Sequence, residues 1–296
     1  MKSQNRRDFL RFATLGAVGA VTLGKIDLKA NTLASDKPGI GLQLYTIRDA
    51  MKTDPAGSLK KVADIGFKYL ELASYADGKF YGYSPEDFKK LVNDLGMEAV
   101  SSHSGVEVKG VDTSNADSMA EAHAKLGVKY CIQPWMVEER RKSVDSYKKF
   151  VAELNVVGGV MKKHGIQFGY HNHDFEFNTV EGKIPYFDIF MKDADPNLVI
   201  FEMDCYWVIK AGQNPIDIFN KYPGRFQLLH IKDMEKSADK FFAPVGTGSI
   251  DYKSIIKAKA ASGMKYMIVE QDNTRDGKPF EAIKISFDNL TNTILV

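Results

Sequence analysis

This sequence of 296 residues has few cysteines and no marked excess of charge of either sign. Cys131 lies in the fourth predicted strand and Cys205 just beyond the sixth, so we expect no disulfide between them. A G-x-G-x-x-G turn is missing after the first predicted strand, which argues against a dinucleotide-binding fold. No linker, low-complexity stretch or second domain is visible in the sequence.

The first thirty residues lack an apolar run long enough to cross a bilayer, and they carry a basic motif instead. The letters RRDFL at 6–10 precede an uncharged stretch at 12–24. This order resembles a twin-arginine export signal, whose apolar part is shorter than a membrane span. We expect residues 1–30 to be a removable signal, cleaved between Ala30 and Ser35, and residues 31–296 to be one exported or periplasmic domain. A disordered basic tail is the alternative.

The predicted signal also carries the positive charge of the chain. Residues 1–30 contain six Lys and Arg against two Asp, so the formal net charge of +2 becomes −2 for the rest. A slightly acidic domain lacks the basic surface that nucleic-acid binding requires. We therefore expect no nucleic acid as a partner, and we also expect no stable membrane insertion of the mature chain.

A helix-like segment, a glycine and a β-rich apolar run recur along the sequence. The glycines fall where a helix would end in a left-handed residue, at Gly66, Gly96, Gly127, Gly165 and Gly263. Eight apolar runs read as strands, at 40–46, 67–72, 97–102, 128–133, 166–171, 198–204, 226–231 and 265–270. Eight strands with room for a helix between them, in about 250 residues, predict an α/β fold, the (β/α)8 TIM barrel. An open doubly wound sheet is the less favoured alternative.

Two of the predicted helices are marked by their first residues. Ser84 precedes Pro85, which is typical of a capped helix start, and a similar helix is expected from Ser143 to His164. Both carry apolar residues at helical spacing, and we expect these stripes to pack against the barrel.

Four apolar runs in the second half end in residues that bind metals. They deliver His171 and His173, Asp204, His230 and Glu270 to one rim, because the carboxyl ends of parallel strands meet there. This pattern predicts a divalent-cation site made by His171, Asp204, His230 and Glu270. The alternatives are a hydrogen-bonded histidine pair in the core and an Asp204 that only caps the following helix.

A cation that holds adjacent carbonyl and hydroxyl oxygens stabilises the enediolate formed when a proton leaves the carbon between them. The candidate catalytic residues are Glu270, Lys232 and His173. Glu270 is the expected base, and Lys232, two residues after His230 and on the same face, could stabilise the oxyanion or return a proton. If a leaving group stands next to the carbanion, the same chemistry gives an elimination.

The chain resembles the xylose-isomerase-like barrel superfamily of sugar phosphate isomerases and epimerases. The resemblance rests on the residues that follow the last three strands in order, which are Asp204, His230 with Lys232-Asp233, and Glu270. The resemblance covers about residues 38–296. It implies one divalent metal, whose coordination is completed by oxygens of the sugar. Mn2+ is the first candidate, and Zn2+, Co2+ and Mg2+ are the alternatives. His171 stands where many members have a catalytic Glu, which puts a shuttle between two carboxylates in doubt.

Other polar and aromatic residues lie near the ends of the first four predicted strands. We expect these to line a sugar pocket, with about half being merely structural: Gln43, Tyr45, Glu71, His103, Gln133 and Trp135. Glu202, one layer deeper than Asp204, is expected to hold His171. The run Gly246-Thr247-Gly248-Ser249 is a weak phosphate-loop candidate, with a turn before a helix capped at Ser249 as the alternative.

The expected activity is that of a metal-dependent isomerase or epimerase on a non-phosphorylated sugar or keto-sugar, since phosphorylated sugars are cytoplasmic. A lyase or hydrolase of 3-keto-glycosides would use the same site. An endonuclease-like phosphodiesterase and a non-catalytic sugar-binding barrel are further alternatives. A small carbohydrate is the expected partner, and the sequence leaves a homo-oligomer open.

Overall fold

The computed structural model describes residues 39–296, apart from 105, 108–109, 112 and 181–183. The predicted export signal at 1–30 lies outside the described residues. The described residues form one compact unit. Among the residues described, none of the helices combines the length and apolarity needed to span a membrane.

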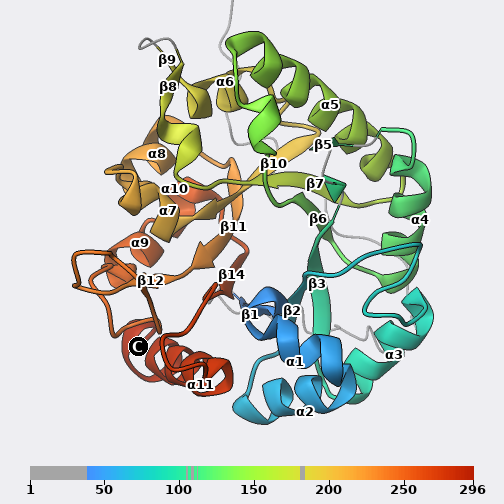
Figure 1. Cartoon of the computed structure of the whole chain (residues 1–296), viewed down its shortest axis with the longest axis vertical. Coiled ribbons are helices and arrows are strands. Elements are labelled where there is room, and N and C mark those ends of the chain that lie inside the picture. Colours follow the sequence, from blue (N-terminus) through green and yellow to red (C-terminus); the bar gives the residue numbers. More distant parts are fainter. Residues whose placement is uncertain (1–38, 105, 108–109, 112, 181–183) are drawn as a thin grey trace, which may run out of the picture. The chain divides into compact units, whose positions relative to one another are not determined.

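Eight parallel strands close into a barrel at the centre of the molecule (Figure 1). Consecutive barrel strands are neighbours, and β14 pairs with β1 to close the sheet. The barrel strands are β1 (Gly39–Gln43), β2 (Tyr69–Leu72), β3 (Glu98–His103), β6 (Tyr130–Gln133), β7 (Gln167–His171), β10 (Val199–Asp204), β11 (Phe226–Ile231) and β14 (Tyr266–Val269). The predicted (β/α)8 barrel is confirmed, and all eight predicted strands are present.

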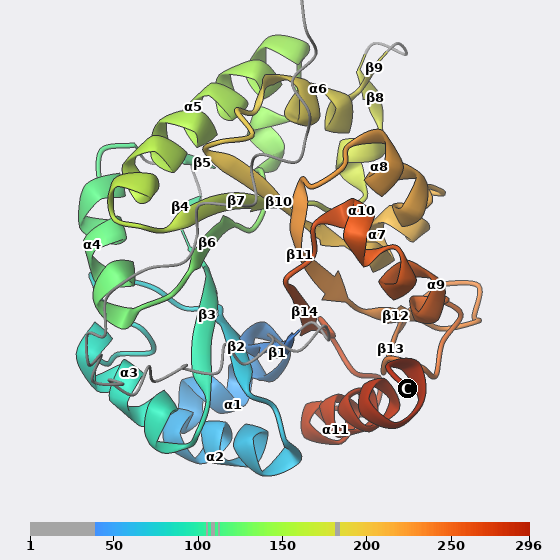
Figure 2. The same ribbon diagram turned by 180° about the vertical axis from the view of Figure 1, so that it is seen from behind.

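Helices surround the barrel, as both views along its axis show (Figures 1 and 2). They are α1 (Arg48–Thr53), α2 (Pro55–Ile65), α3 (Pro85–Asp94), α4 (Ala116–Leu126), α5 (Val144–Lys163), α6 (Tyr186–Asp193), α7 (Cys205–Lys210), α8 (Pro215–Lys221), α9 (Tyr252–Lys257), α10 (Lys259–Ser262) and α11 (Pro279–Asn289). Short helical turns and short hairpin strands complete the described elements. The turns are η2 (Leu44–Ile47), η3 (Glu138–Arg140), η4 (Phe175–Phe177) and η5 (Leu290–Ile294). The hairpin strands are β4 (Val106–Glu107), β5 (Gly110–Val111), β8 (Thr179–Val180), β9 (Ile184–Pro185), β12 (Asp233–Met234) and β13 (Phe242–Ala243).

The helix boundaries follow the predicted signals. Ser84 accepts a hydrogen bond from Asp87 N at the start of α3, and Ser143 accepts one from Ser146 N at the start of α5. The five glycines between helices and strands all have positive φ, from 71° at Gly96 to 119° at Gly66. These caps let each helix end and turn back toward the next strand.

The first strand is shorter than predicted. β1 ends at Gln43 because the Gln43 side chain accepts a hydrogen bond from Tyr45 N and starts the one-turn helix η2. Tyr45 is therefore not a strand residue, and its side chain is exposed at the rim.

The interior of the barrel is built in layers, because residues two apart on a strand face the same way. On β10 Ile200 belongs to an apolar cluster, Glu202 lies above it, and Asp204 ends the strand. On β11 Leu228 belongs to the same cluster and His230 follows it at the level of Asp204. An apolar layer thus supports an inner polar layer and an outer one.

Both cysteines are buried and free, which confirms that they form no disulfide. Cys131 lies within β6, and Cys205 is the first residue of α7. Their neighbours are apolar core residues, and burial raises the pKa of both thiols. They behave as small hydrophobic side chains in this fold.

Candidate metal centre

The outer layer brings together the four predicted ligands. His171, Asp204, His230 and Glu270 each offer one donor atom, and these atoms all lie within 4.8 Å of one another. They come from the carboxyl ends of β7, β10, β11 and β14, which are adjacent in the barrel. Two imidazoles and two carboxylates are a donor set that suits Mn2+ or Zn2+.

Asp204 serves two purposes at once. Its Oδ1 accepts a hydrogen bond from Trp207 N at the start of α7, so the capping role considered from the sequence is real. Its Oδ2 is buried, lies 3.0 Å from Lys232 Nζ and 3.8 Å from His171 Nε2, and accepts no aligned hydrogen bond from the described residues. Burial raises the pKa of Asp204 to about 6. A buried carboxylate oxygen that faces an imidazole and is held only by an ion pair suits a metal ligand.

Lys232 holds the carboxylates of this layer together. Its Nζ lies 3.0 Å from Asp204 Oδ2, 2.7 Å from Glu270 Oε2 and 2.8 Å from Asp272 Oδ1. Burial opposes its charge, but the three carboxylates prevail and raise the pKa of Lys232 well above its usual value. The pKa of Glu270 is lowered, against its burial, chiefly by Lys232 and His230. The outer layer thus holds the ammonium group of Lys232 in a fixed position beside the predicted metal ligands.

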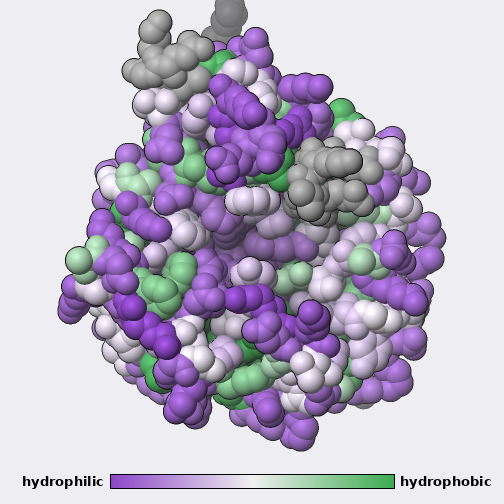
Figure 3. All heavy atoms as spheres, in the orientation of Figure 1, coloured by the Kyte–Doolittle hydropathy of each residue, from purple (hydrophilic) through white to green (hydrophobic). Residues whose placement is uncertain are grey.

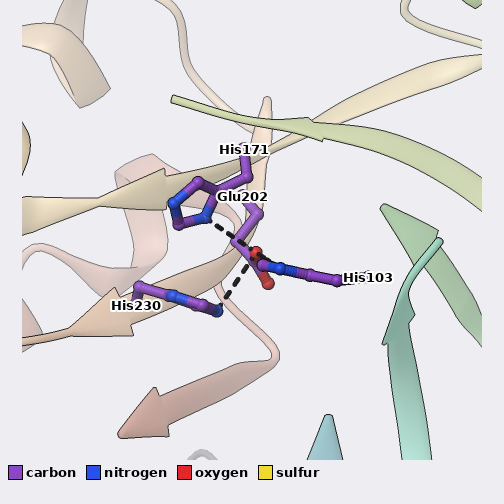
Figure 4. A group of neighbouring side chains, drawn as sticks. All are labelled: His103, His171, Glu202 and His230. Carbon is purple, nitrogen blue, oxygen red and sulfur yellow. Dashed lines mark hydrogen bonds and ion pairs between the residues drawn. The ribbon is translucent and has the colours of Figure 1, made fainter. Parts of the chain in front are cut away.

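An inner layer lies directly beneath. His103 Nε2 is 2.6 Å from Glu202 Oε2 and 3.1 Å from Glu71 Oε2, and His230 Nε2 is 3.1 Å and 2.6 Å from the same two oxygens. Three histidines from three strands point toward the Glu202 carboxylate in Figure 4. Burial opposes the charge on His103, but Glu71 and Glu202 raise its pKa to about 10.

The two histidines of the β7 end differ in position. His171 lies between the layers, with Nδ1 3.0 Å from Glu202 Oε2 and Nε2 toward Asp204, so the expected support by Glu202 is present. His173 lies outside the donor group, against the rings of Trp135, Phe175 and Trp207. Burial lowers the pKa of both, for His173 to about 3, which keeps both imidazoles neutral.

A cavity of about 550 Å³ opens above the outer layer. Its walls are Tyr45, His103, Pro134, Trp135, His171, His173, Trp207, Lys232, Phe242, Glu270, Asp272 and Asn273. In the space-filling view the middle of this face is hollowed and its visible walls are largely hydrophilic (Figure 3). Aromatic rings and charged groups line the cavity together, and they suit the apolar faces and the hydroxyl groups of a sugar.

Three of the six predicted pocket residues line this cavity: Tyr45, His103 and Trp135. The other three are fully buried behind it and need correction. Gln43 Nε2 donates to Glu71 Oε2, Glu71 joins the inner layer, and Gln133 Nε2 donates to the carbonyl of Trp135. These three side chains lie below the rim of the barrel, so they support the cavity wall and do not line the cavity.

Sequence reasoning missed several residues of the cavity. Asp272 follows Glu270 by two, the same spacing that grouped His171 with His173, so its position could have been found. Trp207, Phe242 and Asn273 lie on segments after strand ends and had no comparable signal.

The weak phosphate-loop prediction at 246–249 is wrong. The backbone N–H groups of Gly246 and Gly248 donate to Asp233 Oδ2 at 2.9 Å, and Asp233 Oδ1 accepts two more N–H groups. A buried carboxylate of the chain thus takes the place of a phosphate. The alternative for this run is a turn before a helix capped at Ser249. The turn is present, but Asp251 and not Ser249 caps the next helix.

Comparison with known proteins agrees with this architecture. The xylose isomerase-like TIM barrel profile matches residues 59–292, which is most of the chain. The chain belongs to this family. It is similar to the crystal structure of a sugar phosphate isomerase/epimerase from Parabacteroides distasonis, with 33% identity and a TM-score of 0.77 over 87% of this chain and 99% of that one. The superfamily resemblance seen in the sequence is confirmed.

Curated relatives of this family member are more distant. An inosose dehydratase of Lacticaseibacillus casei is 28% identical over 156 residues, 46% of this chain and 51% of that protein. An inosose dehydratase of Geobacillus kaustophilus is 24% identical over 197 residues, 60% of this chain and 61% of that protein. The chain thus spans only about half the length of the curated relatives it matches. A structure of the IolI protein with a zinc atom, at 18% identity and a TM-score of 0.68, shares the fold.

Proposed function

We propose that this chain is a metal-dependent enzyme that removes a proton from the carbon beside the carbonyl group of a non-phosphorylated sugar or keto-sugar. One observation carries the proposal: four metal donors within 4.8 Å of one another lie beside a buried lysine, and two of them, His171 and Glu270, line an open cavity. His171, Asp204, His230 and Glu270 would hold the cation, with Mn2+ as the first candidate. When bound, it would supply Lewis-acid polarisation of the sugar oxygens.

The residues of the chain divide the remaining work. Glu270 is the proposed base, since it lies on the cavity wall beside the ammonium of Lys232. Lys232 stays protonated between its carboxylates and can stabilise negative charge on a sugar oxygen. His173 and the aromatic rings of Trp135 and Trp207 also line the cavity, where they would orient the sugar and exclude water.

The carboxylates of the cavity favour chemistry on one face of the sugar. Glu270 Oε2 and Asp272 Oδ1 lie 2.7 and 2.8 Å from one ammonium, so they are at most about 5.5 Å apart. Two bases on opposite faces of a carbon need roughly 6 Å or more, since each approaches to roughly 3 Å. These two oxygens therefore suit proton transfer on one face of the sugar, as in isomerisation or elimination, and inversion at one carbon would need the outer oxygens of the two carboxylates or another group of the wall.

Elimination is therefore the second candidate function. A proton removed by Glu270 and a leaving group on the next carbon would give a lyase acting on 3-keto-glycosides or related keto-sugars. The similarity to inosose dehydratases supports this reading, because a dehydratase removes water by such an elimination. Export through a twin-arginine signal is part of the proposal, and cell fractionation tests it.

The first test is elemental analysis of the purified protein, followed by deuterium exchange into free sugars and 3-keto-glycosides in D2O. We expect at least one transition metal per chain, one of them held by the outer layer, and exchange at the carbon next to the carbonyl. Asp204→Asn should lose this metal and the exchange together. Full exchange by Asp204→Asn, or a wild-type protein that takes up no metal, would overturn the proposal.

A further inference from the structure

The inner layer forms a closed ring of four donor atoms. Going round the ring, His103 Nε2, Glu202 Oε2, His230 Nε2 and Glu71 Oε2 alternate nitrogen and oxygen, with edges of 2.6, 3.1, 2.6 and 3.1 Å. The rings of His103 and His230 are stacked with centroids 5.2 Å apart and planes at 7°. The four side chains come from β2, β3, β10 and β11, and none is more than slightly exposed.

The four atoms of the ring are close enough to share one ion. Zinc binds histidine nitrogen and carboxylate oxygen at roughly 2.0 to 2.2 Å in a tetrahedron, so its donors lie roughly 3.3 to 3.6 Å from one another. The ring's edges of 2.6 and 3.1 Å are those of hydrogen-bonded imidazole–carboxylate pairs. A cation would replace the protons between these groups, and the donor atoms would move apart by up to about 1 Å to admit it.

The ring is separate from the outer donor set except at one residue. His230 turns Nδ1 toward Glu270 Oε2 at 3.0 Å and Nε2 toward the ring, so its two nitrogens face different layers. His171 Nδ1 lies 3.0 Å from Glu202 Oε2, whereas His171 Nε2 faces Asp204 in the outer layer. His103 and Glu71 belong to the inner layer alone.

A second observation points to a ligand in this layer. Glu202 Oε1, the carboxylate oxygen that is not one of the ring's four atoms, is buried and has no hydrogen-bond partner among the described residues, so it is available for a second bond from Glu202 to a cation. Buried carboxylate oxygens nearly always have a partner, and a metal ion is one that the protein atoms do not supply. Two fully buried glutamates facing two imidazoles are also a donor set of the kind that borderline divalent metals prefer.

We propose that the ring of Glu71, His103, Glu202 and His230 binds a second divalent cation of the Zn2+ class, beneath the catalytic one. The ring is closed by four protein donors, so this cation has a structural role and fixes the ligands above it. When both sites are filled, His230 binds one cation through Nε2 in the ring and the other through Nδ1 in the outer layer, as an imidazolate whose ring protons have been released to solvent. The inference rests on the proposed outer site only through His230.

The test counts metal ions in the whole protein. Metal-free protein is dialysed against ZnCl2, and bound zinc is measured per chain in the wild type, in His103→Gln and in Asp204→Asn. We expect two equivalents in the wild type and one in each variant, because His103 serves only the ring and Asp204 only the outer layer. Glu71→Gln, which keeps the side-chain shape, should repeat the His103→Gln result, and thermal unfolding identifies any variant that fails to fold.

A second readout separates the two sites without activity. Co2+ bound to the wild type should give two sets of visible absorption bands, and His103→Gln should lack the set that belongs to the ring. If the wild type binds one zinc ion per chain and His103→Gln also binds one, the inference is overturned and the proposed function still stands. Two equivalents in His103→Gln would overturn the assignment to the ring. Loss of both cations in a folded His103→Gln would overturn separate sites, and no zinc in any protein would overturn the proposed function as well.

Discussion

Replacement of Lys232 by methionine tests the electrostatics on which the proposed site depends. The ammonium is 1% exposed and lies within 3.0 Å of three carboxylates, Asp204, Glu270 and Asp272. Removing one partner of a buried charge cluster costs about 3–5 kcal/mol, because the remaining charges stay buried without compensation. We expect metal-free Lys232→Met to lose about that much free energy of unfolding.

A divalent cation should restore part of this loss. It would neutralise the same carboxylates, and a ligand at 100 times its Kd stabilises the folded state by about 2.7 kcal/mol. Because the competing ammonium is gone, we expect Mn2+ to stabilise the variant more than the wild type, so that the gap between them narrows.

The assay is urea unfolding of both proteins with and without MnCl2. Lys60→Met is the matched control, since Lys60 pairs with Asp64 at 2.9 Å on the surface and is 66% exposed. Its loss should cost less than about 0.5 kcal/mol and should not respond to metal. The reasoning is refuted if metal-free Lys232→Met unfolds within about 1 kcal/mol of the wild type, or if Mn2+ leaves the gap unchanged.

Three further predictions concern the base, the fifth-strand ligand and the packing of α5. Glu270→Gln should keep the fold and lower turnover by roughly 10²–10⁴-fold, and a loss below tenfold in steady-state assays would contradict its role as base. His171→Ala should weaken metal binding measured by calorimetry at least about tenfold while His173→Ala does not, and the reverse order would make His173 the ligand. Gly158→Ala should cost about 1–3 kcal/mol in thermal unfolding, because its Cβ would meet the Leu198 carbonyl oxygen at 2.6 Å. The neighbouring Gly159→Ala, with open space at its Cβ, should be neutral or gain up to about 1 kcal/mol, and equal melting of the two would count against this packing.

The arrangement of two layers explains why the site tolerates a histidine at position 171. The inner glutamates Glu71 and Glu202 supply negative charge beneath the outer ligands, and Glu202 fixes the ring of His171. A carboxylate that holds the second nitrogen of a metal-binding histidine sets its tautomer and orientation. Asp272 returns a second carboxylate to the cavity wall at a place other than the fifth strand.

The sequence alone determined the barrel and brought the four proposed ligands to one rim. Apolar runs of strand length, each preceded by a helix and a capping glycine, are local patterns, and the eight strands and their order follow from them. The alternation of side chains also put His171, Asp204, His230 and Glu270 at one rim, because carboxyl ends of parallel strands share an edge.

Only the tertiary structure decided the depth of each residue. Alternation says which face of a strand a side chain takes, but the stagger of neighbouring strands sets its height in the barrel. Gln43, Glu71 and Gln133 are therefore below the rim, whereas Tyr45 and Trp135 reach the cavity. The ring of Glu71, His103, Glu202 and His230 joins residues up to 159 positions apart, and only the closure of the barrel brings such distant positions into contact.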